Sequence, residues 1–145
     1  MSEMVNKLSI LLADTYALYL KTQNYHWHVR GPQFKALHVL FDDQYHALAD
    51  AVDEIAERLL ILGYKAPATF KDYERLKTIK DGDSNAEADQ MLMELANDHG
   101  TLVSDLNEAM RYAEQTRDAG TVDLLSTRLS EHEKARWMLK ASRAI

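Results

Sequence analysis

The chain has 145 residues, 46% of them hydrophobic and 28% charged, so it can bury a core within one domain of ordinary size. It contains no cysteine, which excludes disulfides, thiolate metal sites and cysteine nucleophiles. Its formal net charge is −6, whereas nucleic-acid binders usually present clustered basic residues, so the charge balance favours metal cations as partners or simple solubility.

Nothing in the sequence predicts export or membrane insertion. Residues Met1–Lys7 do not place a cationic start before an apolar run, so no signal peptide is expected. No apolar stretch approaches the roughly 18 residues needed to span a bilayer. We therefore expect one domain over residues 1–145, cytoplasmic and without a membrane partner, with association with the nucleoid left open.

Apolar residues recur every three or four positions in four segments, which predicts four long helices. The first runs from about Met4 to Val29 and is broken by Gly31-Pro32, because proline cannot continue a helix. The second runs from about Gln33 to Leu62 and ends at Gly63.

A connection of about twenty residues, 64–83, follows and is long for a helix–helix loop. Its apolar residues recur at threes (Phe70, Tyr73, Leu76 and Ile79), which predicts a short extra helix. The third long helix should start near Ser84, a candidate N-cap, and the fourth near Thr121. The pattern predicts an all-α, ferritin-like four-helix bundle with a short helix in the long crossover between the second and third helices.

The predicted second helix carries four potential metal ligands on one stripe. At about 100° per residue, with His38 at zero, Asp42 lies at about 40°, Asp53 at about 60° and Glu57 at about 100°. They form two pairs with i, i+4 spacing, and each pair is close enough to share one ion. About 16 Å separates Asp42 from Asp53, so the two pairs of one chain cannot bind the same ion through bonds of about 2 Å.

A second copy of this helix, packed antiparallel about a two-fold axis, would bring the first pair of one copy to the second pair of the other. The axis would cross near Ala47-Leu48, where small side chains, including Ala49 and Ala51, permit close approach. A two-fold contact is isologous, so each dimer would contain two equivalent sites.

His26 lies five residues before the Gly31-Pro32 break, and His38 lies six after it, so a helical hairpin places both imidazoles at similar height. A single His or Asp on a helix is usually structural, but five in this joint spacing favour metal binding. Two imidazoles and several carboxylates without a thiolate suit non-haem iron, with zinc and manganese as alternatives.

At these residues the chain closely resembles the Dps family (DNA-binding protein from starved cells). The resemblance covers nearly the whole chain and is carried by Tyr25–Pro32, Phe34, Leu37-His38, Phe41–Asp43, Asp53–Arg58 and Glu131–Leu139. It implies that His26, His38 and Asp42 of one subunit, with Asp53 and Glu57 of its two-fold mate, are the catalytic ferroxidase ligands and hold one or two iron ions.

The resemblance also implies a hollow homo-dodecamer that oxidises Fe(II), preferentially with hydrogen peroxide, and stores ferric mineral, protecting the cell from oxidative damage. Many members that bind DNA directly carry a lysine-rich N-terminal tail. Here Lys7 is the only basic residue before Lys21, so direct DNA binding is not expected.

Three other functions compete with iron oxidation. A DNA-compacting protein conflicts with the acidic balance and the missing basic tail. A ferritin-type bundle with di-iron in each subunit's own core needs Glu-x-x-His motifs, and the sequence has none. A bundle with only a structural or docking role would bind no metal and oxidise no iron.

For several further residues, a purely structural role competes with a functional one. Trp27 is core or interface filler, or else accepts an oxidising equivalent near the iron, and His46 is a two-fold contact rather than a ligand. Asp43 is a surface residue. The remaining residues are His99 and His132, interpreted as hydrogen-bonded bundle histidines, and Asp118 and Asp123, interpreted as helix-terminal charges or as an acidic iron-entrance pore.

Overall fold

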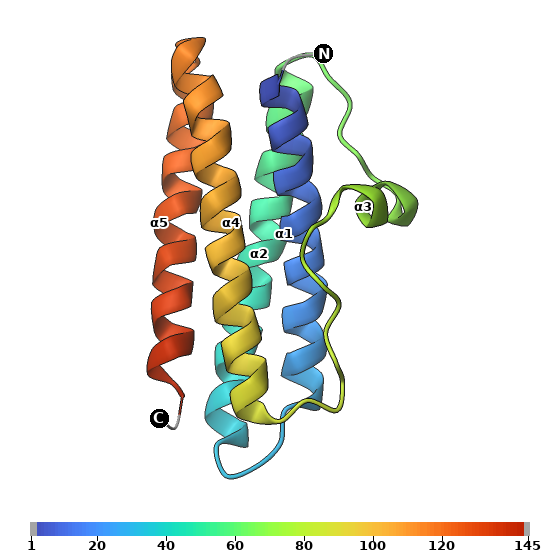
Figure 1. Cartoon of the computed structure of the whole chain (residues 1–145), viewed down its shortest axis with the longest axis vertical. Coiled ribbons are helices and arrows are strands. Elements are labelled where there is room, and N and C mark those ends of the chain that lie inside the picture. Colours follow the sequence, from blue (N-terminus) through green and yellow to red (C-terminus); the bar gives the residue numbers. More distant parts are fainter. Residues whose placement is uncertain (1–2, 144–145) are drawn as a thin grey trace.

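The computed structural model describes residues 3–143 and shows four long helices with a short fifth outside them (Figure 1). The long helices are α1 (Glu3–His28), α2 (Phe34–Ile61), α4 (Ala88–Gln115) and α5 (Ala119–Ala141), and the short one is α3 (Phe70–Leu76). No strand occurs within residues 3–143, so the predicted all-α fold is confirmed. The expectations on a signal peptide and on the outer limits of the domain involve residues 1, 2, 144 and 145, which lie outside the described range.

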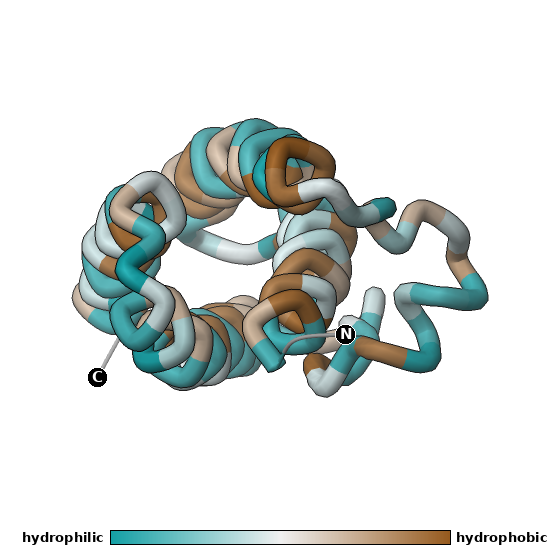
Figure 2. The backbone as a smooth tube through the Cα atoms, turned by 90° about the horizontal axis from the view of Figure 1, so that it is seen from above, coloured by the Kyte–Doolittle hydropathy of each residue, from teal (hydrophilic) through white to brown (hydrophobic). Residues whose placement is uncertain are grey.

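Two antiparallel hairpins, α1–α2 and α4–α5, make up the bundle (Figure 1). The connection over residues 62–87 runs from the end of α2 back along the bundle to the start of α4, and α3 lies on this path beside α1. Viewed from above, the four long helices form a ring, with the connection on one side of it (Figure 2). The one long crossover of the predicted topology is therefore present.

Gly31 explains the sharp turn between α1 and α2. Its φ of 113° is a conformation that residues with a Cβ rarely adopt, and Pro32 follows it. The two helices therefore end and begin within one or two residues of the predicted positions, and the hairpin holds His26 and His38 at the same end of the bundle.

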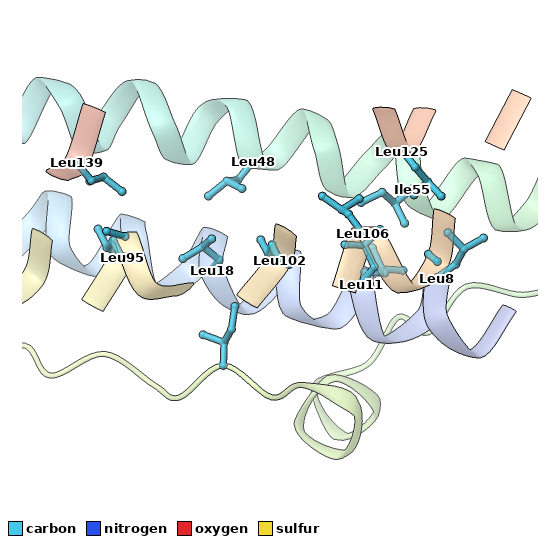
Figure 3. Close-up of a cluster of buried hydrophobic side chains, with 14 of the residues drawn as sticks. Leu8, Leu11, Leu18, Leu48, Ile55, Leu95, Leu102, Leu106, Leu125 and Leu139 are labelled. Atoms are coloured by element: carbon cyan, nitrogen blue, oxygen red, sulfur yellow. The ribbon is translucent and has the colours of Figure 1, made fainter. Parts of the chain in front are cut away.

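Leucines from all four long helices meet along the bundle axis (Figure 3). Leu11 of α1, Ile55 of α2, Leu102 of α4 and Leu125 of α5 are completely buried. Burying each such side chain contributes roughly 1.5–3 kcal/mol relative to leaving it exposed. Most of the predicted apolar positions thus face the core, whereas Phe34 and Leu60 of α2 and Trp137 and Met138 of α5 are exposed.

Buried polar groups attach the long connection to α1. The carboxylate of Asp14, completely buried, accepts hydrogen bonds from the backbone N–H of Thr78 (2.6 Å), its hydroxyl (2.8 Å) and the N–H of Ile79 (3.2 Å). Further along, the Tyr25 hydroxyl accepts from the N–H of Asp83 (3.0 Å) and donates to Glu94 (2.6 Å). The connection is therefore fixed at two places.

Two predicted helix starts require correction. α4 begins at Ala88 rather than near Ser84, because the Ser84 hydroxyl donates to the side chain of Asn24 (3.3 Å) and caps no helix. α5 begins at Ala119, two residues before Thr121, and Asp118 is its N-cap. Tertiary contacts of the connection decided the first boundary, and the sequence pattern did not reveal them.

None of the helices formed by residues 3–143 is both long and apolar enough to cross a lipid bilayer.

Candidate metal centre

His26 near the end of α1 and His38 in the first turns of α2 face each other across the hairpin. Their rings stack with centroids 3.9 Å apart and planes 14° apart. Each ring also contacts the backbone of the other residue: His26 Nδ1 lies 2.7 Å from the carbonyl oxygen of His38, and His38 Nδ1 lies 2.8 Å from that of His26. The hairpin therefore fixes both imidazoles in position.

These reciprocal contacts determine the tautomer of both rings. A carbonyl oxygen only accepts hydrogen bonds, so Nδ1 of each ring carries the hydrogen and donates it. In the neutral imidazole the lone pair then lies on Nε2, the atom left to bind a metal. Histidine ligands are commonly oriented in this way, by a backbone carbonyl that holds the other ring nitrogen.

Asp42 lies one turn after His38 on α2, next to the His26 ring. Its Oδ1 atom is 3.6 Å from His26 Nε2, a separation that two metal–ligand bonds of about 2 Å can span. His46 lies a further turn along, with Nδ1 donating to the Asp42 carbonyl (2.9 Å). Three of the five predicted ligands, His26, His38 and Asp42, are thus brought together by one chain.

Asp53 and Glu57, the other two predicted ligands, lie farther along α2 and are exposed. The eleven residues from Asp42 to Asp53 correspond to about 16 Å of continuous helix. Within residues 3–143 of a single chain, no group of three or more His, Asp and Glu side chains is arranged to hold a metal ion. The single chain therefore presents two separate half-sets of donors: the first, His26, His38 and Asp42, lies at the α1–α2 hairpin, and the second, Asp53 and Glu57, lies farther along α2.

Tyr45 was missed as a neighbour of the site. Its ring lies 5.4 Å from the His26 ring and 4.2 Å from the His46 ring, measured between centroids. The sequence pattern placed Tyr45 on the apolar stripe of α2 and gave no signal of this contact, which depends on how α1 and α2 pack.

Four further residues singled out in the sequence lie on the surface or in the bundle core. Asp43 is exposed, as predicted. The Trp27 side chain is 59% exposed, so it is not part of the core of the chain. Of the two predicted packing roles, only packing at an interface between chains is left. His99 and His132 are buried and hydrogen-bonded to each other through their Nδ1 atoms (2.9 Å), as predicted, and Nε2 of His99 has no hydrogen-bond partner among residues 3–143. Burial and the Arg128 guanidinium lower the pKa of His99 to about 3, so this ring is neutral.

Asp118 acts at the start of α5 as a helix cap. It accepts from the N–H (3.1 Å) and the hydroxyl of Thr121 and pairs with the Arg58 guanidinium at 2.7 Å. Burial opposes ionisation, but the bonds from Thr121 and Arg58 outweigh it and lower the pKa of Asp118. This arrangement supports the helix-terminal interpretation of Asp118, and the pore interpretation of Asp123 stays a prediction.

Comparison with known proteins agrees with this arrangement. A family model described as a ferritin-like domain matches residues 5–143. The chain is 36% identical over 139 residues to DNA protection during starvation protein 2 of Bacillus anthracis, covering 96% of this chain and 95% of that protein. It is 34% identical to general stress protein 20U of Bacillus subtilis, covering 96% of each.

Solved structures give the same result. The Dps protein of Staphylococcus aureus matches with a TM-score of 0.94 at 29% identity, covering 99% of this chain and 96% of that one. The Dps protein of Vibrio cholerae, described as a member of a broad superfamily of ferritin-like diiron-carboxylate proteins, matches with a TM-score of 0.92 at 32% identity, covering 96% and 87%. The fold is therefore ferritin-like, and the chain belongs to the Dps family.

Proposed function

We propose that this protein oxidises Fe(II) and stores the ferric product inside a hollow shell of twelve copies, and so protects the cell from oxidative damage. Hydrogen peroxide is the preferred oxidant in this proposal, and iron is the substrate and cargo. The whole chain, residues 1–145, acts as one ferritin-like domain, cytoplasmic in location. Membership of the Dps family, and the diiron-carboxylate superfamily named for the Vibrio cholerae relative, support iron as the metal.

The observation that carries the proposal is the division of the donors between the end of the α1–α2 hairpin and the later turns of α2. His26, His38 and Asp42 gather at one end of the α1–α2 hairpin, whereas Asp53 and Glu57 lie exposed about three turns away. Each half-set is too small to hold and oxidise iron by itself. An antiparallel copy of α2 supplies the missing half to each, which gives two equivalent sites per two-fold dimer.

The donors suit the chemistry that the reaction needs. The imidazoles present Nε2 lone pairs, and the carboxylates supply hard anionic oxygens, a mixed set that binds Fe(II). The negative charge of the three carboxylates stabilises Fe(III) more than Fe(II), since the attraction grows with the charge of the ion. Oxidation is therefore favoured once iron is bound between the two chains.

A mixing experiment tests the shared site. Asp53→Asn and His38→Ala are each expected to abolish Fe(II) oxidation by peroxide when all subunits carry the same change. If the two variants are dissociated, mixed equally and reassembled, half of the dimers are mixed, and each mixed dimer has one intact site and one site with both lesions. Activity should return to about a quarter of the wild-type value.

The matched control combines two lesions from the same half-set, His38→Ala with Asp42→Asn. In this mixture every site keeps one lesion, so activity should stay at the background level. Failure of the first mixture to recover, with normal reassembly shown by light scattering, would mean that each subunit holds its own site, and the shared-site proposal would then be abandoned.

A further inference from the structure

A continuous series of aromatic rings leads away from the predicted iron ligand His26. The His26 ring contacts Tyr45 at 5.4 Å, Tyr45 contacts Tyr19 at 5.8 Å, Tyr19 contacts Tyr16 at 5.7 Å, and Tyr16 stacks on Tyr73 at 4.7 Å, all between ring centroids. Every step lies within the 4.5–7 Å range of aromatic pairs in direct contact.

The series crosses three helices. Tyr45 belongs to α2, Tyr19 and Tyr16 to α1, and Tyr73 to α3, which lies beside α1 in Figure 1. All four tyrosines are half-buried, so they are partly shielded from solvent. The series therefore connects the end of the α1–α2 hairpin that carries His26 with α3, the short helix of the long connection.

Trp27, next to His26 in the sequence, does not belong to this series. Its side chain is 59% exposed, and it makes no aromatic ring contact with any residue in the range 3–143. Among the tyrosines and tryptophans of residues 3–143, Tyr45 is the one whose ring contacts the His26 ring within the chain, so the series begins at Tyr45.

One molecule of hydrogen peroxide accepts two electrons when it is reduced to water, whereas one Fe(II) ion donates only one. When a single Fe(II) is bound, its reaction with hydrogen peroxide gives Fe(III), hydroxide and a hydroxyl radical. That radical destroys biological molecules unless an electron and a proton reach it at once, and a phenol supplies both.

We propose that Tyr45, Tyr19, Tyr16 and Tyr73 form a radical relay that removes this oxidising equivalent from the iron site. The inference rests on the proposed function and names further residues for the same reaction. The first step is Fe(II) + H₂O₂ + tyrosine → Fe(III) + OH⁻ + H₂O + tyrosyl radical, in which the phenol O–H bond of Tyr45 breaks and its hydrogen forms water.

The radical then moves along the series. At each step the next tyrosine gives one electron and its phenolic proton and becomes the radical, while the previous one regains its O–H bond. A second Fe(II) ends the sequence by donating one electron, with a proton taken from water, which gives Fe(III) and restores tyrosine. Two Fe(II) are thus oxidised per peroxide without release of a hydroxyl radical.

The test uses the assembled protein with one Fe(II) per site or less, mixed with hydrogen peroxide and frozen at short times. Electron paramagnetic resonance should detect a tyrosyl radical in the wild type and lose most of it in Tyr45→Phe, because phenylalanine has no phenolic hydrogen to give. A spin trap should capture several-fold more hydroxyl radical from Tyr45→Phe than from the wild type. The Tyr73→Phe variant should still form a tyrosyl radical, but the radical should move no farther than Tyr16. Peptide mass spectrometry can identify which tyrosines have been oxidised in each variant.

Tyr112→Phe is the matched control, since Tyr112 is half-buried on α4 and has no ring contact in the series. It should behave as the wild type in both measurements. The relay would be overturned if the wild type and Tyr45→Phe released equal amounts of trapped hydroxyl radical while both still oxidised Fe(II). The proposed function would then remain in place. Absence of Fe(II) oxidation in the wild type would instead overturn the proposed function itself.

Discussion

Asp14 and Asp105 form a pair of carboxyl groups in the layer between α1 and α4. Asp14 is completely buried and accepts three hydrogen bonds from Thr78 and Ile79. Burial, a hydrogen bond to Asp14 and the negative charge of Asp14 raise the pKa of Asp105 from 3.8 to about 8, against the weaker opposing effect of Lys7. Asp105 is therefore protonated at neutral pH and donates to Asp14.

This pair makes stability depend on pH. The unfolded chain loses the Asp105 proton near pH 4, whereas the folded chain keeps it until about pH 8. Between these values the folded state binds more protons, so the free energy of unfolding falls as pH rises. The contribution is fully present below pH 4 and is lost as pH rises through the folded pKa.

Asp105→Asn should remove this pH dependence, because the amide is close in shape to the protonated acid and still donates to Asp14. The melting temperature of the variant should rise relative to that of the wild type as the pH increases from 5 to 8. Calorimetry at several pH values measures it, with Glu133→Gln at an exposed position of α5 as the control. If the melting temperatures of Asp105→Asn and the wild type changed with pH in parallel, Asp105 would not be the group that holds the proton.

At the scale of the helices, α5 depends on one residue for its start. Asp118 caps the helix through Thr121, and its ion pair with Arg58 ties this cap to the far end of α2. A Cβ at Gly120 would lie 2.7 Å from the Arg58 guanidinium, so glycine at this position makes room for the pair. One carboxylate thus links the start of α5 to α2.

Asp118→Ala should lower the free energy of unfolding by about 1–2 kcal/mol, since loss of an N-cap alone costs about 0.5–2 kcal/mol. Denaturant unfolding at one fixed protein concentration measures the change. Asp118→Asn keeps an acceptor for the backbone N–H and loses the charge, so it should cost less than alanine. An alanine variant as stable as the wild type would show that the cap and the Arg58 pair contribute nothing.

On the scale of the whole molecule, the isolated chain exposes large apolar side chains that call for a partner. Ile61 is 70% exposed, Trp137 65% and Leu60 55%, so both ends of the bundle carry unpaired apolar surface. Light scattering should give the mass of twelve copies of the 16.6 kDa chain. A stable monomer under native conditions would remove the second half-set of ligands and with it the proposed site.

Charge at the same scale predicts weak or absent direct DNA binding. Each chain carries a formal charge of −6, and twelve copies would make a strongly anionic shell that repels phosphate. Gel-shift assays with duplex DNA at physiological salt should show no complex without added metal, although divalent cations can bridge the two surfaces. A robust, metal-independent complex would contradict this expectation.

The sequence by itself determined the helices and the composition of the candidate site. Helix periodicity is local, so the apolar stripes, the Gly31-Pro32 break and the two pairs on α2 could be identified without knowing the packing. The five predicted ligands follow from fixed spacings along one helix and one short hairpin.

The tertiary structure decided what depends on residues far apart in the chain. Asp14 meets residues more than sixty positions later, and the contact of Ser84 with Asn24 moved the start of α4 to Ala88. The ring contacts of Tyr45 and the tautomers of His26 and His38 likewise arise only when α1 packs on α2. The physical reason is that a repeat along one helix specifies which face is buried, whereas the partner of each side chain on that face is set by the packing of another element.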